Sequence, residues 1–113
     1  MIDTNAINEI ITTYQKHGWI LRRVLLSPGT KQNLGCGNKA AFSDVEVSVA
    51  DFDAAWFSRP PKSGGGVAWE IRHLGRLPFA LLEKVNEDDP EFETVLKEVE
   101  ARLRKAVAAK ESA

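Results

Sequence analysis

The sequence predicts an α+β domain: an N-terminal helix, a mainly antiparallel β-meander of four to five strands, and a long C-terminal helix. Apolar residues recur at helical spacing near both ends, and strand-forming segments lie between them. In the middle, two similar segments with one tryptophan each, 55–59 and 68–72, flank the Pro/Gly-rich stretch 60–66. This is the pattern of a β-hairpin. We expect both helices on one face of the sheet, in a two-layer sandwich.

The first helix is predicted over residues 4–17, with Gly18 as its natural stop. The next segment, 19–26, is rich in strand formers. It is apolar on both faces of the predicted strand apart from one arginine on each, which is typical of a central strand covered at least partly on both sides. The strand ends at the turn residues 27–29, and the glycine-containing segment 30–41 is predicted to be a long loop.

The remaining strands are predicted from alternation and turn residues. Valine alternates with polar residues over 45–49, which indicates a strand with one face in water. The hairpin strands are predicted at 54–59 and 67–74, so that two tryptophans lie on neighbouring antiparallel strands and at least one of them is buried. Residues 77–85 are interpreted as a further strand, although a short helix also suits their sequence.

A long C-terminal helix is predicted over residues 90–109. Asp89 is a favourable N-cap, and proline is favoured at the first helical position. A helix of this length exceeds a typical strand, so we expect its distal part to overhang the sheet or to contact another chain. The expected interface residues are Leu103, Ala106 and Val107. The tail 110–113 is expected to fray.

Length and composition fit a single domain over residues 1–113. Hydrophobic residues make up 43% and charged residues 27%, which is ordinary for a globular protein. The net charge of −1 gives no global attraction to nucleic acids or anionic membranes. The single cysteine permits no intrachain disulfide, and neither a signal peptide nor a membrane-spanning stretch is recognisable. We therefore expect a cytoplasmic protein that does not bind membranes.

The sequence offers few residues for catalysis or cofactor binding. Cys36 lies between glycines, and the histidines are His17 and His73. These side chains are too few for a structural zinc site, and their spacing gives no support for a catalytic Cys–His pair. The glycine-containing loop lacks the Lys-Ser/Thr step of a phosphate-binding loop. We therefore assign no catalytic residue, no metal ligand and no cofactor.

Charge is distributed unevenly along the chain. Basic residues predominate over 16–80, whereas acidic residues predominate over 81–100. The two parts are expected to attract each other, within one subunit or between two. Basic side chains beside Trp56, Phe57 and Trp69 would also suit single-stranded nucleic acid. The near-neutral total charge and the usual place of aromatics in the core disfavour that interpretation.

The leading hypothesis is a non-enzymatic protein-interaction module that forms a homodimer, with a sheet edge or the C-terminal helix binding another chain. It is based on the scarcity of catalytic residue types, the aromatic content and the length of the last helix. The alternative is a small-ligand-binding domain or an enzyme with a cleft between helix and sheet, lined by Arg23, Trp69 and His73. A second alternative is single-stranded nucleic-acid binding on a basic aromatic sheet face.

Overall fold

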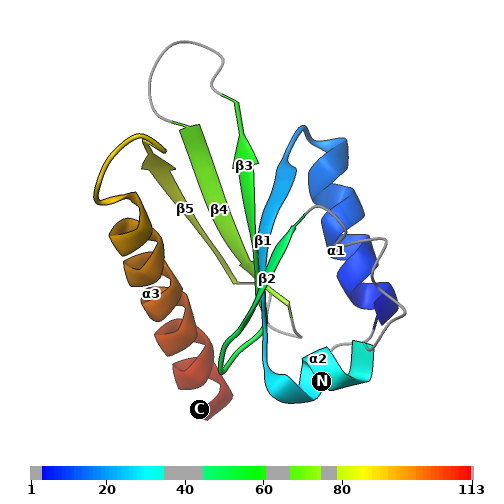
Figure 1. Cartoon of the computed structure of the whole chain (residues 1–113). Helices are drawn as coiled ribbons and strands as arrows, with labels where there is room; N and C mark the ends of the chain where they lie inside the picture. Colours follow the sequence, from blue (N-terminus) through cyan, green and yellow to red (C-terminus); the bar gives the residue numbers. More distant parts are fainter. Residues whose placement is uncertain (1–3, 35–44, 61–66, 75–78, 113) are drawn as a thin grey trace.

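The computed structural model describes residues 4–34, 45–60, 67–74 and 79–112. The elements are α1 (Thr4–Lys16), β1 (Ile20–Leu26), α2 (Pro28–Leu34), β2 (Glu46–Val49), β3 (Ala54–Arg59), β4 (Val67–His73), β5 (Ala80–Val85) and α3 (Phe92–Ser112). The strands form one sheet in the order β2-β1-β3-β4-β5, in which β1 and β2 are parallel and all other neighbours are antiparallel. The predicted α+β class, with a helix near each end and a mainly antiparallel sheet, is confirmed (Figure 1).

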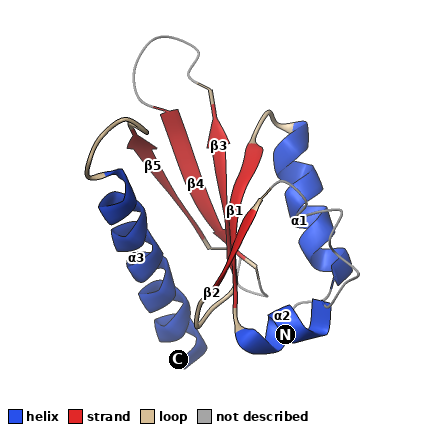
Figure 2. Cartoon of the chain, in the orientation of Figure 1, coloured by secondary structure: helices blue, strands red, loops and turns tan. Residues whose placement is uncertain are grey.

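The two long helices lie on opposite faces of the sheet (Figures 1 and 2). Ile7 of α1 belongs to a core cluster with Phe57, whereas Leu103 of α3 belongs to a second cluster with Trp56. This corrects the expectation of two layers, because the molecule has a helix, the sheet and a second helix as three layers. The reason lies in β1 and β3, which carry buried residues on both faces, so that each face needs its own apolar cover.

A short helix, α2, begins where a long loop was expected. Ser27 precedes it as N-cap: its hydroxyl oxygen accepts a hydrogen bond from the Thr30 amide at 3.5 Å, and Pro28 occupies the first helical position. The Asp53 carboxylate, which precedes β3, accepts hydrogen bonds from the Ser27 amide at 2.7 Å and the Thr30 hydroxyl at 2.8 Å. A residue distant in sequence therefore stabilises this turn. The rest of the predicted loop, 35–41, lies outside the described residues.

Strands β3 and β4 form the predicted hairpin. Trp56 lies opposite Ile71, and Trp69 lies opposite Ser58, so the two indoles are diagonal neighbours on one face of the sheet. Their ring centroids are 6.0 Å apart and their planes cross at 65°. Both side chains are buried. The prediction that the two tryptophans lie on adjacent antiparallel strands is confirmed.

The last strand and helix follow the prediction with small shifts. Residues 80–85 form β5, so the strand interpretation is confirmed over the short helix. The Asp89 carboxylate accepts a hydrogen bond from the Glu91 amide at 2.8 Å, which is the expected capping contact at the start of α3. The helix then runs to Ser112, beyond the predicted end at residue 109.

Candidate interaction surfaces

Two consecutive arginines of β1 lie on the same face of the sheet. Neighbouring side chains of a regular strand alternate between faces, but the register between β1 and β3 shifts between Leu21 and Arg23, which makes Arg22 the extra residue of a bulge. Arg22 Cζ lies 5.0 Å from the ring centre of Trp69, and Arg23 Cζ lies 5.8 Å from that of Phe92. The expectation of one arginine on each face is therefore wrong.

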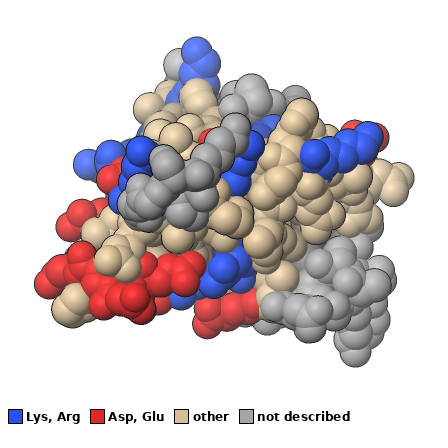
Figure 3. Space-filling view, turned by 90° about the horizontal axis from the view of Figure 1, so that it is seen from above, with Lys and Arg blue, Asp and Glu red and all other residues tan. Residues whose placement is uncertain are grey.

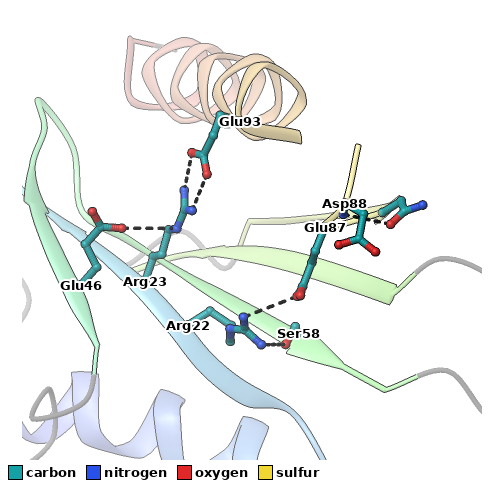
Figure 4. Close-up of polar contacts among 8 residues, drawn as sticks. Arg22, Arg23, Glu46, Ser58, Glu87, Asp88 and Glu93 are labelled. Atoms are coloured by element: carbon teal, nitrogen blue, oxygen red, sulfur yellow. Dashed lines mark hydrogen bonds and ion pairs between the residues drawn. The ribbon is translucent and has the colours of Figure 1, made fainter. Parts of the chain in front are cut away.

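These arginines attach the loop before α3 and the first turn of α3 to the sheet (Figure 4). Arg22 forms an ion pair with Glu87 at 3.4 Å. Arg23 donates to both carboxylate oxygens of Glu93, at 2.8 and 2.6 Å, and its Nε lies 3.4 Å from Glu46. The hydrogen bonds from Arg23 lower the pKa of the Glu93 carboxyl. The expected attraction between basic and acidic parts thus acts within the chain at these pairs.

Acidic side chains gather on the α3 side of the molecule, at the end where β5 leads into α3 (Figure 3). The exposed acids of this loop and of the first helical turn are Glu87, Asp88, Asp89, Glu91 and Glu93. The positive end of the helix dipole favours carboxylates at this position. This cluster is explained by helix capping and by its pairing with the two arginines.

A groove of about 420 Å³ lies between α3 and strands β1 and β2. Helix α3 packs over β4 and β5, so the same face of the sheet is less covered near β2. The groove lining includes Arg23, Leu25, Glu46, Ser48, Lys97 and Glu100. The groove therefore combines side chains of both charges and extends to β2, the edge strand on this side of the sheet.

Glu100 connects this groove to the core. Its carboxylate accepts a hydrogen bond at 2.8 Å from Nε1 of Trp56, whose ring is fully buried. The neighbouring Trp69 differs, because its buried Nε1 has no hydrogen-bond partner in the described part of the chain. A molecule that binds against Glu100 would therefore alter the surroundings of the Trp56 indole.

The β2 edge presents backbone groups to a further strand. The Ala50 amide donates to the Leu26 carbonyl of β1 at 2.9 Å. Peptide groups of a strand alternate in direction, so the amides and carbonyls of Val47 and Val49 point away from β1. The Val49 side chain is 60% exposed. No strand in the described part of the chain pairs with this side of β2.

The opposite edge of the sheet is formed by β5. The His73 amide donates to the Phe79 carbonyl at 2.8 Å, so the peptide groups at every second residue from Ala80 onward point away from β4. These outward-pointing residues are Ala80, Leu82 and Lys84. Leu82 is 57% exposed and lies opposite Glu70, which accepts a hydrogen bond from Tyr14 of α1. The Leu82 side chain therefore lies on the α1 side of the sheet.

The structure brings only part of the predicted ligand site together. Arg23 lines the groove. Trp69 is buried, and its ring centroid lies 5.1 Å from that of Phe92, the ring that Arg23 Cζ approaches at 5.8 Å. His73 is buried opposite Ala54, toward the other end of β4. Neither Trp69 nor His73 belongs to the groove lining.

The residues of the last helix that were expected to contact another chain pack instead toward the sheet of their own chain. Leu103 is fully buried and Val107 is 5% exposed, both in the core cluster formed with the sheet of the same chain. Ala106 is half-buried. The apolar seam of α3 is thus covered as far as Val107, and the sheet edges remain the more open surfaces.

The aromatic residues considered for nucleic-acid binding are also in the core. Phe57 packs in the cluster on the α1 side, and Trp56 and Trp69 pack in the cluster on the α3 side. None of the three is more than 2% exposed. These rings therefore form no stacking platform on the surface.

Cys36 lies outside the described residues. Within the described ranges, no group of three or more His, Cys, Asp or Glu side chains is placed so that it could hold a metal ion. The helices in those ranges include none with the length and apolar character needed to cross a membrane. Comparison of the chain with protein-family models, curated proteins and solved structures found no match. Function is therefore inferred from the surfaces of the chain itself.

Proposed function

We propose that this chain is a protein-interaction module that forms a homodimer through the β5 edge. One observation carries the proposal: Leu82, at 57% exposure, lies in the middle of an edge strand whose alternate peptide groups point outward. An unprotected strand edge is a template for pairing with another chain. Two copies that pair antiparallel across a twofold axis would join their sheets into one and cover Leu82.

The side chains of β5 suit such a pairing. In the register centred on Leu82, the two Leu82 side chains meet across the axis, and Ala80 of each copy lies opposite Lys84 of the other. The small alanine leaves room for the lysine stem to lie along the apolar contact while its amine stays in water. No like charges oppose each other on this face.

Two further features favour β5 over the other surfaces considered for self-association. Strand β5 has six residues and β2 has four, so β5 offers the longer row of backbone partners. The C-terminal helix already uses Leu103 against its own sheet. These observations support the sheet-edge form of the homodimer hypothesis.

The test is the mass of the protein in solution, measured by sedimentation equilibrium across a range of micromolar concentrations. We expect a species of twice 12.5 kDa for the unmodified chain. Leu82→Asp places two carboxylates opposite each other at the axis and is expected to give the monomer. Val49→Asp is the matched control, because it makes the same kind of change at an exposed residue of the other edge.

Two results would contradict the proposal. A chain that is monomeric at every concentration has no such dimer. A dimer that persists in Leu82→Asp uses another surface, and its loss in Val49→Asp alone would identify β2 as that surface.

A further inference from the structure

We infer that the groove between α3 and β2 is a separate binding site, which takes an extended polypeptide segment as an added strand along β2. The segment has lysine or arginine side chains on one face and apolar side chains on the other. The backbone of β2, the charges of the groove and the exposed valine of the edge support this inference independently of the β5 dimer.

The first support is the direction of the peptide groups. Val47 and Val49 point their amides and carbonyls away from β1, because the Ala50 amide is already bonded to β1. An extended segment beside β2, at a spacing of ~4.8 Å, would accept from and donate to these groups. Such binding depends on the ligand backbone and therefore requires a polypeptide.

The second support is the charge of the groove. Its carboxylates are Glu46, Glu93 and Glu100, and its cations are Arg23 and Lys97. Arg23 is already engaged by both oxygens of Glu93 and by Glu46. Lys97 follows Glu93 by four residues and precedes Glu100 by three, so it shares a helix face with both. With three carboxylates against two cations, the groove keeps a net negative charge, which favours a ligand with positive side chains.

Glu46 and Glu100 define where that charge is recognised, because Glu93 takes both short hydrogen bonds of Arg23, whereas Glu46 has a single longer contact with it at 3.4 Å. Glu46 is a β2 residue with a 66% exposed side chain, and it shares the α3 side of the sheet with Ser48. A side chain of the added strand that points to this side lies next to Glu46. The long stem of lysine or arginine would extend past Ser48 into the groove that Glu100 also lines. An acidic side chain at the same position would meet carboxylates.

The third support is the exposed apolar surface of β2, which the other face of the added strand would meet. Side chains of a strand alternate, so the residues between the basic ones lie beside Val47 and Val49. Val49 is 60% exposed, and an apolar side chain would remove part of this surface from water. Together these features specify a segment in which basic and apolar residues alternate.

The experiment uses short blocked peptides in which valine alternates with lysine. A peptide in which valine alternates with glutamate is the charge control, and a valine–lysine peptide with N-methylated amides is the backbone control. Binding is followed by the NMR shifts of the Val47 and Val49 amides and of the Trp56 indole N–H. We expect saturable shifts with the valine–lysine peptide and much weaker shifts with both controls.

Variants then test the assigned carboxylates. Glu46→Gln and Glu100→Gln are each expected to weaken binding about two- to fivefold, as for a partly exposed ion pair. Glutamine at position 100 retains an acceptor for the Trp56 indole. Glu83→Gln changes a carboxylate of β5 that pairs with Arg102, and it is expected to leave binding unchanged.

Three outcomes would overturn the inference: equal binding of the glutamate peptide, equal binding of the N-methylated peptide, or no saturable shift at β2 at millimolar peptide. The titration is repeated with Leu82→Asp, which is expected to bind the lysine peptide as the unmodified chain does. Failure of the β5 dimer and failure of the peptide site are therefore separate results.

Discussion

Arg23 and Glu93 form a bidentate ion pair that joins strand β1, which lies between β2 and β3, to the first turn of α3, with nitrogen–oxygen distances of 2.8 and 2.6 Å. The pair is positioned by the β-bulge at Arg22, which sets the register of β1 against β3. Phe92 lies beneath the Arg23 guanidinium and against Trp69. The same contact therefore closes one end of the core and forms one wall of the groove.

Glu93→Gln is expected to lower the free energy of unfolding at neutral pH by about 0.2–1 kcal/mol, because the Glu93 side chain is 58% exposed and water screens the pair. The pKa of Glu93 is lowered in the folded chain, so the stabilisation is present above the pKa of the unfolded carboxyl and is lost as pH falls through the folded value. Urea unfolding at neutral and acidic pH measures this difference. Glu91→Gln, at an exposed residue before the helix, is the control. A difference between Glu93→Gln and the unmodified chain that stays constant in acid would contradict the prediction.

Tyr14 is expected to keep its proton until the chain unfolds. Its ring stacks on Phe57 at 4.1 Å, and its hydroxyl donates to Glu70. Burial, then this hydrogen bond, raise its pKa above the ordinary value of 10.0. Because the unfolded chain loses the proton first, the stability due to Tyr14 is complete below that value and is lost as pH rises above it.

The measurement is straightforward because Tyr14 is the single tyrosine of the chain. Tyrosinate absorbance and circular dichroism are followed together through alkaline pH. We expect both to change in one transition. Tyrosinate that forms near its ordinary pKa while the circular dichroism stays native would refute the buried, hydrogen-bonded state.

Substitution of the two hairpin tryptophans by phenylalanine is expected to lower the free energy of unfolding by different amounts. Trp56→Phe removes the hydrogen bond to Glu100, whereas Trp69→Phe removes a buried N–H that has no partner in the described part of the chain. Both substitutions lose ring area, but only the first loses a satisfied donor. Trp56→Phe is therefore expected to cost about 1 kcal/mol more than Trp69→Phe. Denaturant unfolding of the two variants measures the difference, and an equal or reversed order would contradict it.

Local sequence patterns were sufficient for the elements whose formation depends on neighbouring residues. The hairpin and the start of α3 follow from turn residues and from Asp89 as N-cap. Helix α2 was not predicted because it has no apolar periodicity, and its first turn is held by Asp53, the residue before β3. The bulge at Arg22 likewise depends on pairing with β3, which no pattern within β1 reveals.

The candidate surfaces were less accessible to prediction. Residue type suggested Trp69 and His73 as ligand contacts, but type does not reveal that both side chains are buried. Glu93, Lys97 and Glu100 do share a helix face at a spacing visible in the sequence. Their role in a groove depends on which strands α3 covers, and that is decided by the packing of the whole sheet.

Substitution by aspartate is expected to reduce stability at one leucine and to abolish dimerisation at another. Leu103 is fully buried between α3 and the sheet, so Leu103→Asp places a carboxylate in the core and should cost ~3 kcal/mol or more of unfolding free energy. Leu82 is 57% exposed, so Leu82→Asp should change the unfolding free energy of the monomer by less than ~1 kcal/mol while it abolishes the dimer.

Urea unfolding at dilute concentration and sedimentation at high concentration separate these two effects. The seam of α3 is an internal packing surface if Leu103→Asp destabilises the chain under both conditions. It is an intermolecular surface, as first expected for Leu103, if Leu103→Asp gives a monomer of native stability. That second result would also remove the reason for preferring β5, because the distal helix would then be available to a second copy.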